Sequence, residues 1–484
     1  MTLLTDIDTS DKDLGTGTFF EQLPLNYITT LQGIRFMSSE TPSELIYQLD
    51  DKPPALESFF AAIQHLLASF VGIVTPTLII SSILGLQEQL PYLISMALIA
   101  SGIGTFIQAY KPFGIGAGML CVQGTSFAFL GAILSAGFII RDAGGGPEEI
   151  IALITSLCFI GSFVQIGLSQ FIPRLRKIVT PLVTGIVITS IGISLIKVGM
   201  TDLAGGINSP DFGSPTNLML GFFVIAVIVL MNISSNNWIR LSSVVVGLIA
   251  GFGVAVITGM VSSSDLLPSA VISVPLPFKY GFNFELAALI PLAVIYIISS
   301  VETTGDITAN CVISGQPIAG EGYIQRIKSG VLGDGINSMI AAVLNTFPNT
   351  TFSQNTAVIQ LTGIASRHIG MYIAAILVFI GLFQGVGDIL QQIPKPILGG
   401  ATLVMFGTVA AAGIKILASE YIDRRKMIII AVSLGLGLGS ALVPDVFAKT
   451  PDLVQNIFRS AAATAGITAM LLSMLLPELK EKEI

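Results

Sequence analysis

Long apolar stretches, each close to the length of a membrane-spanning helix, follow one another along most of this chain. A helix needs ~20 apolar residues to cross a bilayer. Pro, Gly and charged residues separate the stretches, which lie near residues 59–86, 90–109, 115–137, 150–171, 178–199, 217–232, 241–260, 285–312, 327–346, 352–365, 369–386, 393–417, 427–443 and 459–477. The pattern predicts about fourteen transmembrane segments and an all-α polytopic membrane protein.

The composition excludes an ordinary water-soluble enzyme. Of the 484 residues, 52% are hydrophobic and only 11% are charged, whereas soluble domains carry about 25% charged residues. No Ser/His/Asp or metal-ligand set is present, so we do not expect an enzyme. The three cysteines, Cys121, Cys158 and Cys311, lie in apolar surroundings without metal-ligand spacing, and we interpret them as packing residues.

The charge of the chain is concentrated before the first apolar stretch. Residues 1–57 contain ten acidic and three basic side chains, so they carry the whole of the net charge of −7. They lack the basic start and cleavage site of a signal peptide, and we expect a partly disordered cytoplasmic tail. The remaining residues are neutral overall, which argues against an acidic cation pore.

Basic side chains predict the orientation in the membrane. They gather in the loops that follow even-numbered segments, at Lys111, Arg174, Arg176, Lys177, Arg240, Arg326, Lys328, Arg367, Arg424, Arg425 and Lys426. Loops rich in Lys and Arg stay in the cytoplasm. Both termini, including the short C-terminal tail 479–484, are therefore expected to be cytoplasmic.

Two segments begin alike and indicate an internal repeat. Pro181, Gly185 and Gly192 in the fifth segment have counterparts 215 positions later in the twelfth, at Pro396, Gly400 and Gly407. One such match in a Gly-rich chain is weak, but it fits two repeats of seven segments. Because seven is odd, such repeats would cross the membrane in opposite directions.

The third and tenth segments are too polar for uninterrupted helices that face lipid. The third contains Val122-Gln-Gly-Thr-Ser-Phe127 and the tenth contains Thr350-Thr-Phe-Ser-Gln354. Non-helical backbone occurs at membrane depth only where protein or a water-filled cavity satisfies its polar groups. We predict short extended segments that line a cavity, as in transporters built from inverted repeats. The alternative is a pair of loops at the membrane surface.

A few ionisable side chains remain inside the predicted membrane body. Glu302 and Asp306 lie four residues apart, on one face of a helix, and Asp334 and His65 interrupt other segments. Intramembrane ionisable residues are functional candidates by default, and a carboxyl group that can be charged or neutral can couple proton movement to substrate movement. The alternative for each residue is a structural role, bonded to a neighbouring helix.

The side chains of the polar segments suggest a type of ligand. Gln354 offers an amide donor and acceptor, Glu302 offers two acceptor oxygens, and Phe127 and Phe129 offer flat faces for stacking. This set is complementary to a planar heterocycle with adjacent C=O and N–H groups, such as an oxopurine or uracil. A sugar would need more hydroxyl-bonding groups, and an inorganic anion would need Arg, Lys or a bare helix N-terminus.

At these residues the chain also resembles a known family. The run from Thr351 to Gly363, with Gln354, Asn355 and Thr362, resembles the signature of the nucleobase–ascorbate transporters, also called nucleobase:cation symporter-2. Further runs are similar to the bacterial xanthine permease branch. They are Ser43–Pro54, Gln64-His65-Leu-Leu, Gly124-Thr-Ser-Phe127, Glu302-Thr-Thr-Gly-Asp306 and Gly330-Val-Leu-Gly-Asp334-Gly.

The resemblance implies roles for individual residues. It implies substrate binding by Glu302, Gln354, a stacking Phe127, the Ser353 backbone and Asn355, and support of the site or of proton coupling by His65, Asp306 and Asp334. The chain departs from the pattern at Ala357, where the motif has Gly, at Thr356, where xanthine permeases often carry Asn, and at Ser126, where some of them carry Asn. These three positions are expected to tune specificity, because a methyl group at 357 narrows the backbone's freedom.

The resemblance also implies an architecture. Segments 1–4 and 8–11 (residues 58–172 and 283–390) would form a core domain that moves against a gate domain of segments 5–7 and 12–14 (residues 173–282 and 391–478). The protein would work as a homodimer in the inner membrane. The proton would be its coupling ion, with no other cofactor and no nucleic-acid partner.

These expectations amount to a proton-coupled importer of oxopurines, with xanthine as the first candidate substrate. Urate is the next candidate. Uracil fits less well, because the resemblance implies Glu, and not Gln, at the position of Gln354 in uracil permeases of this family. The rival from another class is an anion transporter of the same broad architecture, which would need a positive substrate site in place of Glu302.

Overall fold

The computed structural model describes residues 45–172, 180–206, 209–236, 239–240, 242–261, 272–318, 320–352 and 354–477. These residues form mainly α-helices. Among them, eight helices are long and apolar enough to cross a bilayer. The chain is thus a multi-pass membrane protein, as the hydropathy pattern predicts.

Each apolar segment of the sequence contains one helix. They are α2 (Ala55–Leu84), α3 (Leu90–Tyr110), α4 (Leu130–Asp142), α5 (Pro147–Leu168), α7 (Pro181–Leu203), α8 (Pro215–Asn232), α10 (Ser243–Ile257), α11 (Leu286–Ile313), α12 (Glu321–Val343), α13 (Gln354–Thr362), α14 (His368–Gly381), α16 (Lys395–Ala418), α17 (Arg424–Leu442) and α19 (Ala461–Leu475). Shorter helices, α15 (Gly385–Gln391) and α18 (Asp452–Arg459), lie in the links. The exact number of membrane crossings stays a prediction.

The third and tenth segments are broken, as their polarity predicts. Strands β1 (Gln123–Thr125) and β2 (Asn349–Thr351) pair antiparallel, with Gly124 opposite Thr350. All six strand residues are buried. The two strands satisfy each other's backbone groups, which is what extended chain requires at membrane depth. The alternative of surface loops is therefore wrong.

Two glycines beside the strand pair leave room for the ring of a phenylalanine. A Cβ at Gly124 would collide with the ring of Phe352, and one at Gly72 on α2 would come within 2.8 Å of the same ring. The Phe352 side chain is buried in this space. The Phe352 ring thus fills the space between α2 and β1.

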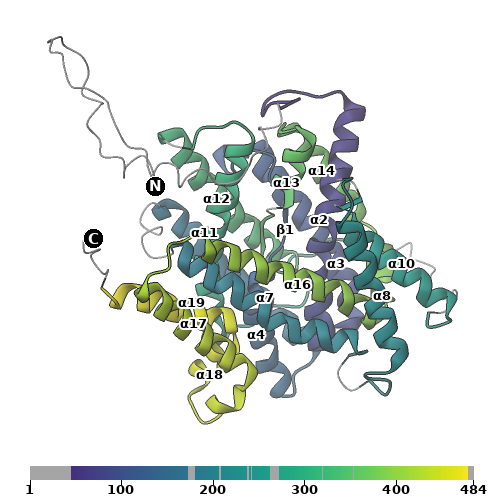
Figure 1. Cartoon of the computed structure of the whole chain (residues 1–484), viewed down its shortest axis with the longest axis vertical. Helices are drawn as coiled ribbons and strands as arrows, with labels where there is room; N and C mark the ends of the chain where they lie inside the picture. The colour runs from purple at the N-terminus through teal and green to yellow at the C-terminus, as the bar shows by residue number, and fades with distance from the viewer. Residues whose placement is uncertain are drawn as a thin grey trace, which may run out of the picture. The chain divides into compact units, whose positions relative to one another are not determined.

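Helices α7 and α16, which carry the sequence repeat, pack along each other (Figure 1). Gly185 lies near Leu417, Gly192 near Ala410 and Gly199 near Leu403, so the two helices run antiparallel. A Cβ at Gly192 would collide with the backbone nitrogen of Ala410. The glycines therefore permit a closer approach of the two helix backbones than larger side chains would.

The packing partners follow a two-fold pattern. When the two helices of several contacting pairs are each exchanged for the counterpart seven segments away, the exchanged pair is again in contact. The α3–α14 contact corresponds to α12–α5, the α8–α16 contact corresponds to α17–α7, and α8–α10 corresponds to α17–α19. This is the pattern expected of two inverted repeats.

The first described residues pack on the link between α13 and α14. The backbone N–H groups of Ile46 and Tyr47 donate to the Gly363 carbonyl, and the Ala365 N–H donates to the Tyr47 carbonyl. Arg367 forms an ion pair with Asp50 at 2.8 Å. Part of the predicted tail 1–57 is thus ordered against the membrane body, and α2 begins at Ala55, ahead of the predicted boundary.

The three cysteines are free and buried. Cys158 lies under Tyr296, whose hydroxyl donates to the Cys158 carbonyl at 2.8 Å. Asn310 donates to the Cys121 sulfur at 3.2 Å. These contacts confirm that the cysteines are packing residues.

Candidate functional site

Two helices begin directly after the paired strands. The short 3₁₀ helix η3 (Phe127–Phe129) follows β1 and leads into α4, and α13 follows β2. The Ser126 hydroxyl caps η3 by accepting a hydrogen bond from the Ala128 N–H at 3.3 Å. Helix α11 contacts η3, β2 and α13. The N-terminal ends of two half-helices therefore lie beside the helix that carries Glu302.

Glu302 and Gln354 reach this junction from α11 and α13. Glu302 is half-buried on α11, and Gln354 is exposed as the first residue of α13. No hydrogen bond to either side chain is recorded from the residues that the structure describes. Both side chains are thus available to a ligand. Position 353, whose backbone was expected to contribute, lies outside the described residues.

Asp306 follows Glu302 by one helical turn and is also half-buried. The carboxyl groups of Glu302, Asp306 and Asp334 lie close enough for their charges to interact. Two like charges at short range disfavour each other. The cluster can therefore respond to the gain or loss of a proton at any one member.

Asp334 is fully buried and has a structural set of partners. Its carboxylate accepts hydrogen bonds from Gln108 on α3 at 2.6 Å, from Thr303 on α11 at 2.5 Å and from the Thr351 hydroxyl on β2 at 3.1 Å. Asp334 itself lies on α12. One carboxylate thus joins three helices and a strand next to Glu302.

The paired strands β1 and β2 belong to the same polar network. Gln123 of β1 donates to the Thr351 hydroxyl at 2.9 Å and accepts from Asn337 of α12 at 3.3 Å. Sequence reasoning singled out the acidic residues and missed Gln108 and Asn337. An amide inside an apolar stretch is the signal that could have found them, because a buried amide must be hydrogen-bonded.

His65 and Asn355 lie together behind the start of α13. His65 is fully buried, and neither of its ring nitrogens forms a hydrogen bond to another residue that the structure describes. Its side chain interacts with that of Asn355, whose Nδ2 donates to the Leu120 carbonyl at 2.5 Å. Asn310 donates to the same carbonyl at 2.7 Å. His65 is therefore placed to act on the site through Asn355.

The two phenylalanines of η3 have different surroundings. Phe127 is half-buried and packs edge-on against Phe406 of α16, with ring centroids 6.1 Å apart. Phe129 is fully buried, and its ring lies 4.6 Å from that of Tyr296. The expectation that Phe129 offers a face for stacking is therefore wrong, because Tyr296 and the surrounding core occupy its faces. Phe127 is only half-buried, so its ring can still offer a face for stacking.

The specificity positions lie on the same two half-helices. Thr356 is buried in the first turn of α13. Ala357 follows it within α13. Ser126 is committed to capping η3. All three lie within a few residues of Gln354 or Phe127 along the chain.

Comparisons with known proteins place the chain in a family of permeases. Residues 56–446 match the model of a permease family. The chain is 43% identical to the xanthine permease XanP of Escherichia coli over 444 residues, which cover 91% of this chain and 96% of XanP. It is 40% identical to the xanthine permease XanQ of the same organism, over 90% of this chain and 94% of XanQ.

Solved structures share the fold at low sequence identity. The transmembrane domain of the cyanobacterial bicarbonate transporter BicA superposes with a TM-score of 0.57 at 14% identity, covering 85% of this chain and 99% of that one. The murine anion transporter Slc26a9, in an inward-facing state, superposes with a TM-score of 0.59 at 11% identity, covering 96% of this chain and 73% of that one. These likenesses concern the fold alone.

Proposed function

This chain belongs to the nucleobase–ascorbate transporter family of permeases, and on that premise we propose that it imports an oxopurine nucleobase, xanthine first, together with a proton. Its xanthine permease relatives support a nucleobase as the substrate. The observation that carries the proposal is that α11 and α13 are in contact, with Glu302 half-buried on the first and Gln354 exposed at the start of the second, and no hydrogen bond recorded to either side chain among the described residues.

The chemistry of the site matches an oxopurine. The Glu302 carboxylate would accept hydrogen bonds from ring N–H groups, and the Gln354 amide would both donate to a carbonyl and accept from a neighbouring N–H. Phe127, held edge-on by Phe406, would present its ring to the base. Backbone at position 353 and the Asn355 side chain would complete the contacts.

Proton coupling would depend on the acidic cluster. Glu302 would bind the base and a proton together, because a neutral carboxyl group removes a charge from the membrane interior. Asp306 interacts with Glu302, and Asp334 holds the helices of the site in register. His65 would support Asn355.

Two packing patterns support the proposed movement. The two-fold exchange of helix contacts fits fourteen spans in two inverted repeats, and the glycine-lined α7–α16 pair would form the centre of a gate domain. The domain of α2 to α5 and α11 to α14 would move against it as a body and carry the site between the two sides of the membrane. The protein would work as a homodimer in the inner membrane, with both termini cytoplasmic.

An anion substrate is the second candidate, because BicA and Slc26a9 share the fold. Helix N-termini at η3 and α13 could attract an anion. The half-buried Glu302 beside them would repel it. We therefore place anion transport below nucleobase transport, and urate next to xanthine within the favoured class.

Uptake measurements test both the substrate and the coupling. Radiolabelled xanthine, urate, hypoxanthine, guanine, uracil and bicarbonate are offered to cells that lack their own permeases, with and without a protonophore. We expect xanthine to accumulate and the protonophore to abolish its accumulation. Accumulation of none of the nucleobases would refute the substrate, and xanthine accumulation that ignores the protonophore would refute the coupling.

A further inference from the structure

Residues 272–285, which lead into α11, form a described segment that the proposed site does not use. We call this segment the α11 strap. Ile272, its first residue, pairs antiparallel with Phe383, and the N–H group of Ser273 donates to the Leu382 carbonyl at 2.8 Å. Leu382 and Phe383 directly follow α14. The strap is therefore fastened at its beginning to the end of α14.

The middle of the strap holds the turn that leads from α12 into β2. The carbonyl of Leu276 accepts a hydrogen bond from Asn345 Nδ2 at 2.7 Å. The N–H group of Phe278 donates to the carbonyl of Val343, the last residue of α12, at 3.0 Å. Asn345 lies between α12 and β2 with a left-handed backbone, φ 63°, which Asn adopts more readily than most other side chains. The strap thus binds the residue at which the chain turns from helix to strand.

A tyrosine at the start of α3 connects the strap to a third helix. Tyr92 is buried, and its hydroxyl accepts a hydrogen bond from the Leu276 N–H group at 3.3 Å. The Lys279 ammonium group lies 4.0 Å from the centroid of the Tyr92 ring, and the Tyr280 ring packs edge-on against the same ring. An aromatic face attracts a cation placed over it. Leu276 is thus held between Tyr92 on one side and Asn345 on the other.

The last part of the strap packs on α5. The N–H group of Asn283 donates to the Ser156 hydroxyl at 3.0 Å. The ring centroids of Phe278 and Phe159 lie 5.4 Å apart. Within the described residues, the hydrogen bonds that leave the strap all go to α3, to α5 or to the residues at the ends of α12 and α14. These helices belong to the body that is proposed to carry the substrate site.

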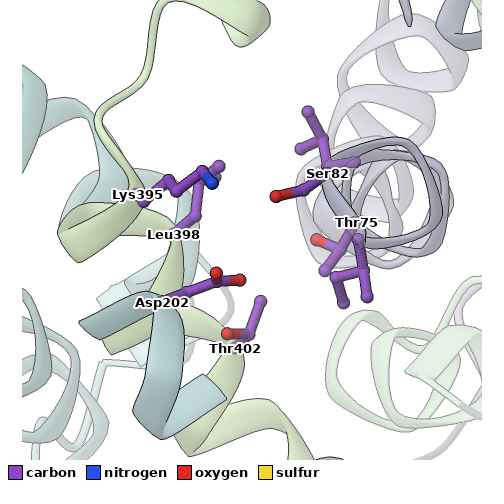
Figure 2. Close-up of a pocket in the computed structure, with 8 residues that line it drawn as sticks. Thr75, Ser82, Asp202, Lys395, Leu398 and Thr402 are labelled. Carbon is purple, nitrogen blue, oxygen red and sulfur yellow. The ribbon is translucent and has the colours of Figure 1, made fainter. Parts of the chain in front are cut away.

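The other body lies across a small cavity from the end of α2. Figure 2 shows Ser82, near the end of α2, facing Asp202 and Lys395 of the α7–α16 pair across this cavity. Helix α3 begins shortly after α2 ends, so Tyr92 lies at this end of the molecule too. The strap is thus fixed to one body near a place where the two bodies face each other.

We propose that the α11 strap positions the substrate site, with Tyr92 and Asn345 holding the α12–β2 turn through Leu276. The strap moves as part of the body that carries the site. Because β2 begins a few residues after Asn345 and leads to α13, a shift of the turn displaces Gln354, at the start of α13, relative to α11. Tyr92 and Asn345 are positioning residues, since they act through β2 and not on the base. This inference rests on the proposed function.

A disulfide between the strap and the end of α14 tests the shared movement. Directly paired residues of antiparallel strands have Cα atoms about 4.5–5.5 Å apart, which suits a disulfide, so Ile272→Cys and Phe383→Cys can be joined by oxidation. Both positions are exposed, whereas the native cysteines are buried. The comparison variant carries Ser82→Cys and Lys395→Cys, joined across the cavity of Figure 2 by a flexible bis-maleimide. Thiols left for a fluorescent maleimide measure the extent of each cross-link.

We expect the strap disulfide to leave xanthine uptake unchanged, because its two ends move together, and the link across the cavity to lower uptake several-fold. Loss of uptake on oxidation of the strap pair, restored by a reductant, would overturn the shared movement. Uptake that survives both cross-links would refute the proposed movement of the two bodies and, with it, the strap's part in that movement.

Point variants test the positioning itself. Tyr92→Phe removes only the hydroxyl that Leu276 bonds, and Asn345→Gly removes the side chain but suits the left-handed backbone. Tyr110→Phe, at the exposed far end of α3, is the matched control. We expect the first two variants to raise the xanthine concentration for half-maximal uptake several-fold, with maximal uptake per transporter unchanged. An unchanged half-maximal concentration in both, or a loss confined to maximal uptake, would contradict the positioning role.

Hydrogen exchange tests the same role without a substrate. In Tyr92→Phe we expect the backbone amides of residues 346–352 to exchange several-fold faster than in the parent and in Tyr110→Phe, because the turn ahead of β2 is held less firmly. Equal exchange in the three proteins would overturn the hold on β2, whichever nucleobase is carried. If the parent takes up no xanthine while exchange responds as expected, the proposed substrate is refuted and the role of the strap stands.

Discussion

Thr303 Oγ1 donates a hydrogen bond to Asp334 Oδ2 at 2.5 Å, and this bond joins α11 to α12 one residue away from Glu302. The same carboxylate holds Gln108 and Thr351. The position of Glu302 is therefore set by a buried carboxylate on another helix. A side chain that orients a functional group in this way is as important to the site as one that touches the ligand.

Asp334→Asn is expected to destabilise the protein and weaken transport. The amide nitrogen of Asn would face groups that donate hydrogen bonds, and an unsatisfied buried polar group costs about 1–3 kcal/mol. Thermal unfolding in detergent should occur at a lower temperature than in the parent. The control is Asp445→Asn, at an exposed position in a link. Equal melting temperatures for the two variants would contradict this role.

Glu302→Gln is expected to abolish xanthine uptake while the protein still reaches the membrane. The change removes the charge and the proton-binding group but keeps the shape of a side chain that has no recorded hydrogen bond to lose. Uptake and the amount of protein in the membrane fraction are measured together. Glu321→Gln, exposed in the first turn of α12, is the matched control. Normal transport by Glu302→Gln would refute the assignment of the site.

The repeat-related glycines Gly192 and Gly407 should respond differently to the same change. Gly192→Ala forces a methyl group into the backbone of Ala410, whereas nothing lies within 4 Å of a Cβ at Gly407. Overpacking costs about 1–3 kcal/mol, and Gly to Ala in an open helix stabilises by up to about 1 kcal/mol. Thermal unfolding should show a loss for the first variant and none for the second. A loss of similar size in both would contradict the close α7–α16 approach.

Ala357→Gly is expected to change the substrate profile more than the amount of protein. Glycine restores the residue of the family motif and increases backbone freedom two residues after Asn355. Competition of unlabelled urate, hypoxanthine and guanine against labelled xanthine measures the profile. Identical competition in parent and variant would show that Ala357 has no effect on substrate choice.

The N-terminal contacts predict two different outcomes of truncation. A chain that starts at residue 44 keeps the hydrogen bonds from Ile46 and Tyr47 to Gly363, and one that starts at residue 52 loses them together with the Arg367–Asp50 ion pair. Each lost backbone hydrogen bond contributes about 1 kcal/mol. We expect a lower melting temperature for the shorter chain alone. Equal melting temperatures for both truncations would show that these contacts do not stabilise the α13–α14 link.

Much of the fold could be predicted because the membrane restricts the choices. Apolar length identifies the helices, and polar residues at membrane depth identify the places where helices break. The polarity around Gln123 and Thr350 predicted the extended segments, which form the pair β1–β2. The glycines at 185 and 192 predicted a repeat, and they lie where α7 meets α16.

The sequence by itself determined which residues are chemically unusual, since Glu302, Asp306, Asp334 and His65 stand out against apolar neighbours. Only the tertiary structure decided how they differ. Asp334 is bonded to three partners while Glu302 has none recorded, and Phe129 is buried while Phe127 borders α16. The physical reason is that hydrogen bonds and ring contacts here join residues about 30 to more than 200 positions apart, and local pattern carries no information about such pairs.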